Sequence, residues 1–139
     1  MAAATLVNVA VPQPVVSVSA GTTTTATGTT VQTSGAAVTM TTSGTGYNLN
    51  SVSLAAGTWA ILGIAGSSTS GTVTAYLSTT SASKTNAWTV QTTGTGVEPV
   101  SVTIAAVAKL ASTTTVYLNG SGSASSMSTY GILRAIRIA

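Results

Sequence analysis

Side chains able to carry acid–base or ionic chemistry are scarce in this sequence. Its 139 residues include one carboxylate, Glu98, and four cations, Lys84, Lys109, Arg134 and Arg137. General acid–base catalysis normally uses His, paired carboxylates or a Lys of tuned pKa. The chain has no His, so we expect no catalytic residues and predict that the protein is not an enzyme.

Nucleophile pairs made of a hydroxyl and a lysine are the one catalytic arrangement that the composition allows. Ser83 precedes Lys84, and Ser112 follows Lys109 at close spacing. Ser and Thr make up about a third of the chain, so such neighbours arise by chance. Solvated lysines are the expected interpretation of both pairs.

Metal and cofactor sites are also unexpected. Zinc and iron–sulfur centres need His or Cys, and the chain contains neither. Calcium sites in proteins usually need several carboxylates, and a single one is present. The sequence therefore predicts no metal ligands, no cofactor-binding residues and no cofactor.

The distribution of charged and apolar residues also limits the kinds of partner that we expect. A formal net charge of +3 comes from scattered cations, whereas DNA-binding proteins typically make about 6–10 phosphate contacts. The longest strictly apolar run, 59–65, is too short to span a bilayer, and the N-terminal residues lack the cationic region of a secretory signal. We expect neither a nucleic acid nor a membrane partner, and synthesis in a cytoplasm.

Period-two alternation of apolar residues recurs along the chain and predicts strands. Val100, Val102 and Ile104 form one such series. Short segments of this kind, joined by Gly, Ser and Asn, are typical of a β-sandwich or barrel. We expect a hairpin turn at Asn119-Gly120 and a helical turn over Ala105–Ala111. Strands are expected at residues 48–54, 58–65, 71–78, 86–92, 100–104, 115–118 and 130–138.

The chain divides by composition at about residue 46. Residues 1–46 contain prolines and a Thr-rich tract and are expected to form an N-terminal arm with Thr-rich low-complexity strands. Within this arm Ala37, Val38 and Met40 are the evident candidates for the core. Residues 47–139 are expected to form a single domain.

Four residues are candidates for contacts with partners. Arg134 and Arg137 should lie on opposite faces of the last strand, where charges either protect an edge or pair across a subunit boundary. Glu98 is the only carboxylate side chain, so it or the C-terminal carboxylate is a candidate partner for one arginine across such a boundary. Trp88, in a polar stretch, is the candidate exposed contact, whereas Trp59, beside Ile and Leu, should be a core anchor.

Two stretches resemble small virion domains of tailed bacteriophages. They are LAAGTWAILGIAG, residues 54–66, and TTTVYLNGSGSASSMSTYGILRAIRIA, residues 113–139. Such domains are similar to the jelly rolls of the tumour necrosis factor and complement globular-head superfamily, which commonly assemble as trimers. The resemblance covers roughly residues 47–139.

The resemblance implies an all-β fold: a single antiparallel β-sandwich, jelly-roll-like, with an extended N-terminal arm. It implies a structural virion protein, a homotrimeric capsid decoration protein (cement protein or head spike) that binds the major capsid protein or another virion protein through its arm. The alternative is a receptor-binding knob of a phage tail or head fibre that recognises the host surface. Aromatic residues amount to 4% of the chain, and their scarcity favours decoration, because binding surfaces are rich in Trp, Tyr and Arg.

Overall fold

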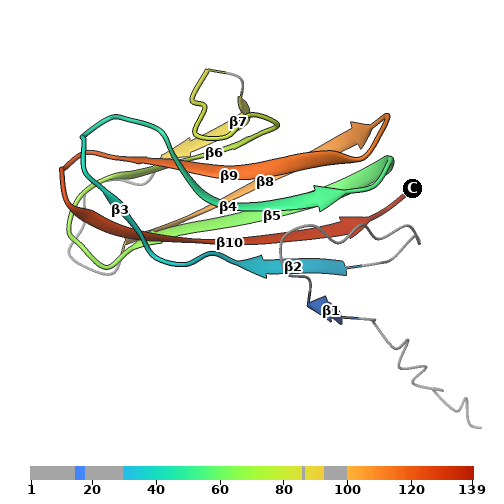
Figure 1. Ribbon diagram of the computed structural model, residues 1–139, viewed down its shortest axis with the longest axis horizontal. Coiled ribbons are helices and arrows are strands. Elements are labelled where there is room, and N and C mark those ends of the chain that lie inside the picture. Colours follow the sequence, from blue (N-terminus) through green and yellow to red (C-terminus); the bar gives the residue numbers. More distant parts are fainter. Residues whose placement is uncertain (1–14, 18–29, 86, 93–99) are drawn as a thin grey trace, which may run out of the picture.

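The computed structural model describes residues 15–17, 30–85, 87–92 and 100–139, which form two β-sheets packed face to face and no helix (Figure 1). The predicted all-β sandwich is therefore confirmed. The strands in chain order are β1 (Val15–Ser17), β2 (Thr30–Ser34), β3 (Val38–Met40), β4 (Tyr47–Leu54), β5 (Gly57–Ser67), β6 (Val73–Ser78), β7 (Ala87–Thr92), β8 (Val100–Leu110), β9 (Thr114–Gly122) and β10 (Met127–Arg137).

The topology is jelly-roll-like. The six-stranded sheet has the order β1-β2-β10-β5-β8, with β3 also paired to β10, and the four-stranded sheet has the order β4-β9-β6-β7. Antiparallel pairs are nested in the sequence: β2 with β10, β4 with β9, β5 with β8, and β6 with β7. The chain thus resembles one long hairpin rolled into two sheets. Strands β2 and β3, which precede residue 47, belong to the six-stranded sheet.

Alternating side chains fill the space between the sheets. In β6 the residues Val73, Ala75 and Leu77 are fully buried, so alternate residues of this strand face the core. Trp59 is also fully buried, and its indole Nε1 donates a hydrogen bond to the carbonyl oxygen of Ala55 at 2.9 Å. Trp59 is therefore the core anchor that its neighbours predicted.

The predicted hairpin at Asn119-Gly120 is wrong, because β9 continues through both residues to Gly122. Asn119 is fully buried, and its amide Nδ2 donates to the carbonyl oxygen of Thr80 at 2.8 Å. Its Oδ1 accepts from the backbone N–H of Ala82 at 2.9 Å. A Cβ at Gly120 would lie 2.6 Å from Leu49 Cδ1. The hydrogen bonds to residues that follow β6 therefore explain Asn119, and the close approach of Leu49 on the neighbouring strand β4 explains Gly120.

The helical turn predicted over Ala105–Ala111 is also wrong. Strand β8 runs to Leu110 because its whole length pairs with β5, from Ser67 opposite Val100 to Gly57 opposite Leu110. Small Ala residues carry no strong preference of their own here, so the long neighbouring strand decides their conformation.

The core candidates before residue 47 were partly right. Met40 is fully buried and Val38 packs against the core. Ala37 is exposed, so that prediction is wrong. Val31, which the Thr-rich composition obscured, is fully buried on β2, because β2 pairs with β10 and turns alternate residues inward.

Candidate functional site

The outer face of the six-stranded sheet, turned away from the four-stranded sheet, is rich in aliphatic side chains. On β10, Leu133 and Ala135 are buried in the core, so their neighbours point outward. The same alternation turns one set of side chains outward on β5 and β8. Seven aliphatic residues share neighbouring positions on this aliphatic face: Ile132 and Ile136 of β10, Ala60, Leu62 and Ile64 of β5, and Ala105 and Val107 of β8.

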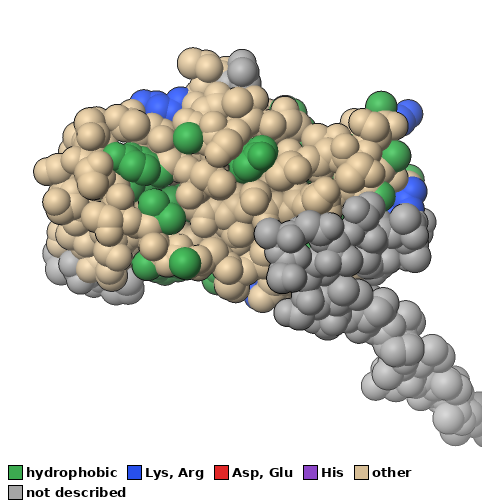
Figure 2. Space-filling model, viewed as in Figure 1, with side chains coloured by type: hydrophobic (Ala, Val, Ile, Leu, Met, Phe, Trp, Pro, Cys, Tyr) green, Lys and Arg blue, Asp and Glu red, His purple; other side chains and the backbone are tan. Residues whose placement is uncertain are grey.

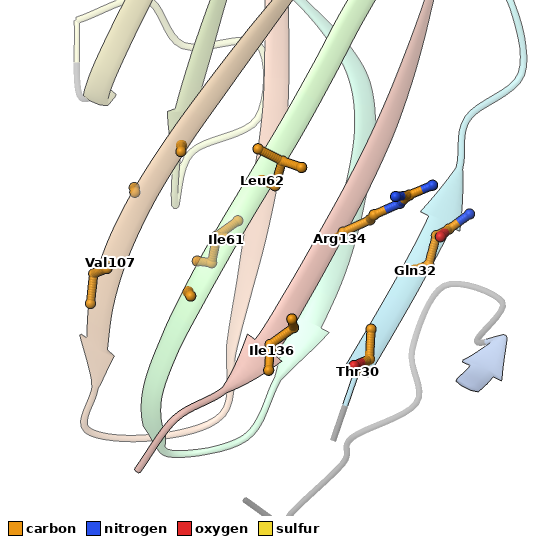
Figure 3. A pocket seen from close by; sticks show the side chains of 10 residues that line it. Thr30, Gln32, Ile61, Leu62, Val107, Arg134 and Ile136 are labelled. Carbon is orange, nitrogen blue, oxygen red and sulfur yellow. The ribbon is translucent and has the colours of Figure 1, made fainter. Parts of the chain in front are cut away.

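A groove of about 720 Å³ lies in the aliphatic face (Figure 3). In the strand register Ala60 lies between Ile136 of β10 and Val107 of β8. The single methyl group of Ala60 is shorter than its two neighbours, so this row is hollow in the middle. The groove therefore follows from a small residue on the central strand and larger residues on both sides.

Polar side chains form one margin of the groove. Thr30 and Gln32 of β2 and Arg134 of β10 line it there. Figure 3 shows the Arg134 side chain extending beside that of Gln32, which is its partner in the strand register. The site thus combines an aliphatic floor with one cation and hydrogen-bonding groups at its side.

Several side chains of the aliphatic face are open to solvent. Val107 is 69% exposed and Ile136 is 43% exposed. On one face of a sheet each outward side chain occupies about 33 Å², because only every second residue of a strand points to that face. The seven aliphatic side chains therefore cover roughly 230 Å². Stable interfaces cover about 800 Å² on each partner. The aliphatic face is thus large enough for the centre of an interface, with the polar residues around it as a rim.

The outer face of the four-stranded sheet has a different character. Its outward positions carry mostly hydroxyl groups, including Ser51, Ser53, Thr74 and Thr115, next to buried Val and Leu residues. Tyr76 Oη and Ser121 Oγ are 3.1 Å apart and share a hydrogen bond on this sheet. In the view of Figure 2, hydrophobic side chains are sparse on the described surface, and Lys and Arg lie toward its ends. An extended aliphatic surface is therefore a property of the six-stranded sheet.

Arg134 and Arg137 lie on opposite faces of β10, as alternation predicted. Arg134 is exposed on the aliphatic face, and no hydrogen bond or ion pair joins it to another of the described residues. The Arg137 Nε donates to the carbonyl oxygen of Ala139 in the same chain, at 3.3 Å. Ala139 is held in turn by the N–H of Thr58, at 2.6 Å from the same oxygen. The two arginines are therefore separated, and Arg134 is the one available to a partner.

The other candidate contacts lie elsewhere. Trp88 is 41% exposed on β7, an edge strand of the four-stranded sheet. Glu98 lies outside the described residues. Of the lysines considered for nucleophile pairs, Lys84 donates through its Nζ to the carbonyl oxygen of Gly44, and Lys109 is exposed on β8. Of Trp88, Lys84 and Lys109, none lines the groove.

Within the described ranges, no group of three or more His, Cys, Asp or Glu side chains is placed to hold a metal ion. The same part of the chain contains no helix long and apolar enough to cross a membrane.

The sequence did not predict the groove, although one feature of it indicated a second contact surface. Strand β5 is apolar at nearly every position, with Ala60, Leu62 and Ile64 alternating with Trp59 and Ile61. A near-continuous apolar run is typical of a strand covered on both faces. One face of β5 is covered by the four-stranded sheet, so the run itself indicated a second contact surface.

No protein-family model matches the chain, and no curated protein or solved structure matches it either. The function is therefore argued from the residues and their arrangement.

Proposed function

We propose that this chain is a structural virion protein, a trimeric capsid decoration protein of a bacteriophage. The observation that supports this proposal best is the aliphatic outer face of the six-stranded sheet. Apolar side chains grouped on an exposed sheet face, with polar residues at their margin, would suit the centre of a contact with another protein. In the proposed assembly this face lies against neighbouring copies.

The energetics favour such an arrangement. Covering one Val, Leu or Ile side chain that water would otherwise reach contributes about 1.5–3 kcal/mol. Val107 and Ile136 are exposed in the single chain, and Leu62 and Ile64 are half-buried. A second protein surface would gain this contribution with few charges to desolvate, since Arg134 and Lys109 are the cations on this face.

The low charge of the whole chain points in the same direction. Charged residues amount to 4% of the sequence, whereas a free domain is best kept in solution by a surface with about 25–35%. Packing among copies and against a shell would leave less surface to solvate. The resemblance of residues 47–139 to trimeric virion domains supports a trimer, and the residues that precede β2 would serve as the arm that binds the shell.

The mass in solution tests the self-association. We expect wild-type protein to sediment at three times the chain mass of 13.5 kDa. Leu62→Glu places a carboxylate in the middle of the aliphatic face and should give monomers. Thr115→Glu makes the same change of charge on the hydroxyl-rich face and should leave the trimer intact. A wild-type protein that is monomeric at every concentration would contradict the proposal.

Deletion of residues 1–20 tests the role in decoration. The shortened protein should remain trimeric but fail to bind virus particles, and the copy number of the full chain should be a multiple set by the shell symmetry. The alternative, a receptor-binding knob, is supported by the exposed Trp88. A knob would keep binding host cells after the same deletion and would be present in only a handful of copies per particle.

A further inference from the structure

We infer that the groove in the aliphatic face is filled by Trp88 of a second copy of the chain. The inference rests on the proposed self-association and names the contact through which it occurs. It concerns two surfaces on different sheets: the groove over β10, β5 and β8, and the exposed indole on β7.

The shape of the groove suits an inserted side chain. Its floor carries the side chains of Ala60 and Ala105, and Leu62, Val107 and Ile136 rise around these two alanines. Pockets that take organic groups typically have about 300–1,000 Å³, and the volume here is about 720 Å³. A large flat side chain would replace the solvent in this hollow and cover the exposed aliphatic walls.

Trp88 is the matching feature on the described surface. The exposed large hydrophobic residues are Trp88, Val107, Ile136 and Ile138, and the last three belong to the six-stranded sheet or its C-terminal extension. Trp88 is the only aromatic among them, and it does not line the groove of its own chain. A buried Trp covers about 150–250 Å² of surface, so its exposure leaves a large apolar group for a partner to cover.

Electrostatic complementarity favours an aromatic occupant. Arg134 stands at the margin of the groove and has no hydrogen bond or ion pair to another of the described residues, so its guanidinium face is open to an inserted side chain. A guanidinium interacts favourably with the face of an indole ring, and Trp is the best aromatic partner for a cation. Trp and Arg are also the residues that most often dominate the binding energy of interfaces.

The arrangement of the two surfaces determines the kind of assembly. Because the groove and Trp88 are different parts of the molecule, each copy uses one surface toward one neighbour and the other surface toward the next. Such a heterologous contact closes into a ring or continues as a filament, whereas a two-fold dimer joins identical patches. The inference therefore agrees with a cyclic trimer.

Fluorine NMR on protein labelled with 5-fluorotryptophan tests the contact directly. The chain has two Trp residues, and Trp59 is fully buried, so one resonance reports the core and the other reports Trp88. We expect the Trp88 resonance to shift with protein concentration as copies associate. The Trp59 resonance should stay in place, and the spectrum of Trp88→Ala assigns the two signals.

One variant removes the inserted side chain, a second fills the groove that receives it, and a third serves as a control. Trp88→Ala and the groove-filling Ala60→Leu should each weaken self-association at least about tenfold in sedimentation equilibrium. Thr103→Leu places the same leucine side chain on the outer face of β8 but outside the groove, and it should change association less than about twofold. If Ala60→Leu fails to fold, Ala105→Leu fills the groove from an exposed position.

The outcomes separate this inference from the proposed function. A wild-type oligomer that persists in Trp88→Ala, or whose Trp88 resonance ignores concentration, overturns the inference and leaves self-association standing. If Trp88→Ala associates weakly but Ala60→Leu and Ala105→Leu associate normally, Trp88 contacts a surface other than the groove, and that part of the inference is overturned. A wild-type protein that stays monomeric at all concentrations contradicts both proposals.

Discussion

Arg134 of β10 lies directly opposite Leu62 of β5 in the antiparallel register, one row away from the pair formed by Ile136 and Ala60. A guanidinium is thus carried within an aliphatic surface. Covering that surface with protein desolvates the charge, which is costly unless the partner offers an opposite charge or an aromatic face. Any protein that covers this sheet must therefore place an opposite charge or an aromatic face against Arg134.

The first prediction concerns the pairing of Arg134 with Glu98, the only acidic side chain in the chain. Glu98 lies outside the described residues, so the prediction rests on charge alone. Reversing either charge, with Arg134→Glu or Glu98→Arg, should weaken self-association roughly fivefold. The protein that carries both substitutions should recover most of the lost self-association. Sedimentation equilibrium of the wild type, the two single variants and the double variant measures this. A guanidinium stacked on an indole keeps its edge free for a carboxylate, so this pairing and the Trp88 contact are compatible.

Arg137 supplies the control for that cycle, because its Nε already donates to Ala139 of its own chain. Arg137→Glu should not be rescued by Glu98→Arg. Assembly that is unaffected by Glu98→Arg would remove the ion pair from consideration.

The second prediction concerns the buried amide of Asn119. Its Nδ2 has three acceptors, Ser78 Oγ and the carbonyl oxygens of Thr80 and Ser83, and its Oδ1 has the N–H of Ala82 as donor. Asn119→Ala removes these hydrogen bonds, although Ser78 Oγ and the Thr80 carbonyl oxygen keep the hydrogen bond between them. Since an intramolecular hydrogen bond contributes about 0.5–1.5 kcal/mol net, we expect the free energy of unfolding to fall by about 2–4 kcal/mol.

Urea denaturation followed by circular dichroism measures this loss. Thr115→Ala, on the same strand but half-buried on the outer face, is the matched control and should change stability by less than about 0.5 kcal/mol. Equal stabilities for the Asn119 and Thr115 variants would show that the amide network does not hold the loop after β6.

The third prediction concerns the glycine at the middle of β5. A Cβ at Gly63 would lie 2.8 Å from Leu118 Cδ1 and 2.9 Å from Ile104 Cγ2. Gly63→Ala therefore overpacks the core and should lower the free energy of unfolding by about 1–3 kcal/mol. Shortening the neighbour with Leu118→Val in the same protein should recover part of the loss, and thermal unfolding of the two variants compares them. A Gly63→Ala protein as stable as wild type would mean that the two sheets can move apart at this point.

The fourth prediction concerns the pH dependence contributed by Tyr47. The hydrogen bond with the Thr41 hydroxyl, with further bonds from Thr41 and Thr42, lowers the pKa of the Tyr47 phenol below its ordinary value of 10.0, although desolvation acts in the opposite direction. The folded chain then gives up this proton at a lower pH than the unfolded chain does. The contribution to stability is present above the unfolded pKa and is lost as the pH falls through the folded one.

Alkaline titration of the tyrosine absorbance measures this effect. An ionisation step below the ordinary tyrosine pKa should appear in the wild-type titration and be absent in Tyr47→Phe. If the wild-type and Tyr47→Phe titrations differ only in amplitude at the ordinary tyrosine pKa, the hydrogen bonds to Thr41 and Thr42 do not favour the phenolate.

The candidate site was predictable in part. Alternation along the last strand is enough to predict that Arg134 and Arg137 lie on opposite faces, because successive side chains of a strand must point in opposite directions. Arg137 donates to the carbonyl oxygen of Ala139 because the C-terminal residues lie alongside Thr58, which hydrogen-bonds to them. No local pattern in the sequence contains that contact.

By itself the sequence determined the fold class and the alternation of side chains in strands such as β8, since apolar periodicity is a property of neighbouring residues. It misled at Asn119-Gly120, where a strong turn signal was overridden by the pairing of β9 with β4 and β6. Only the tertiary structure decided the aliphatic face and its groove. Ala60, Val107 and Ile136 are far apart along the chain and become one surface through the strand order β10-β5-β8 and its register. A groove depends on which side chains lie side by side across strands, and that relationship exists only once the strands have paired.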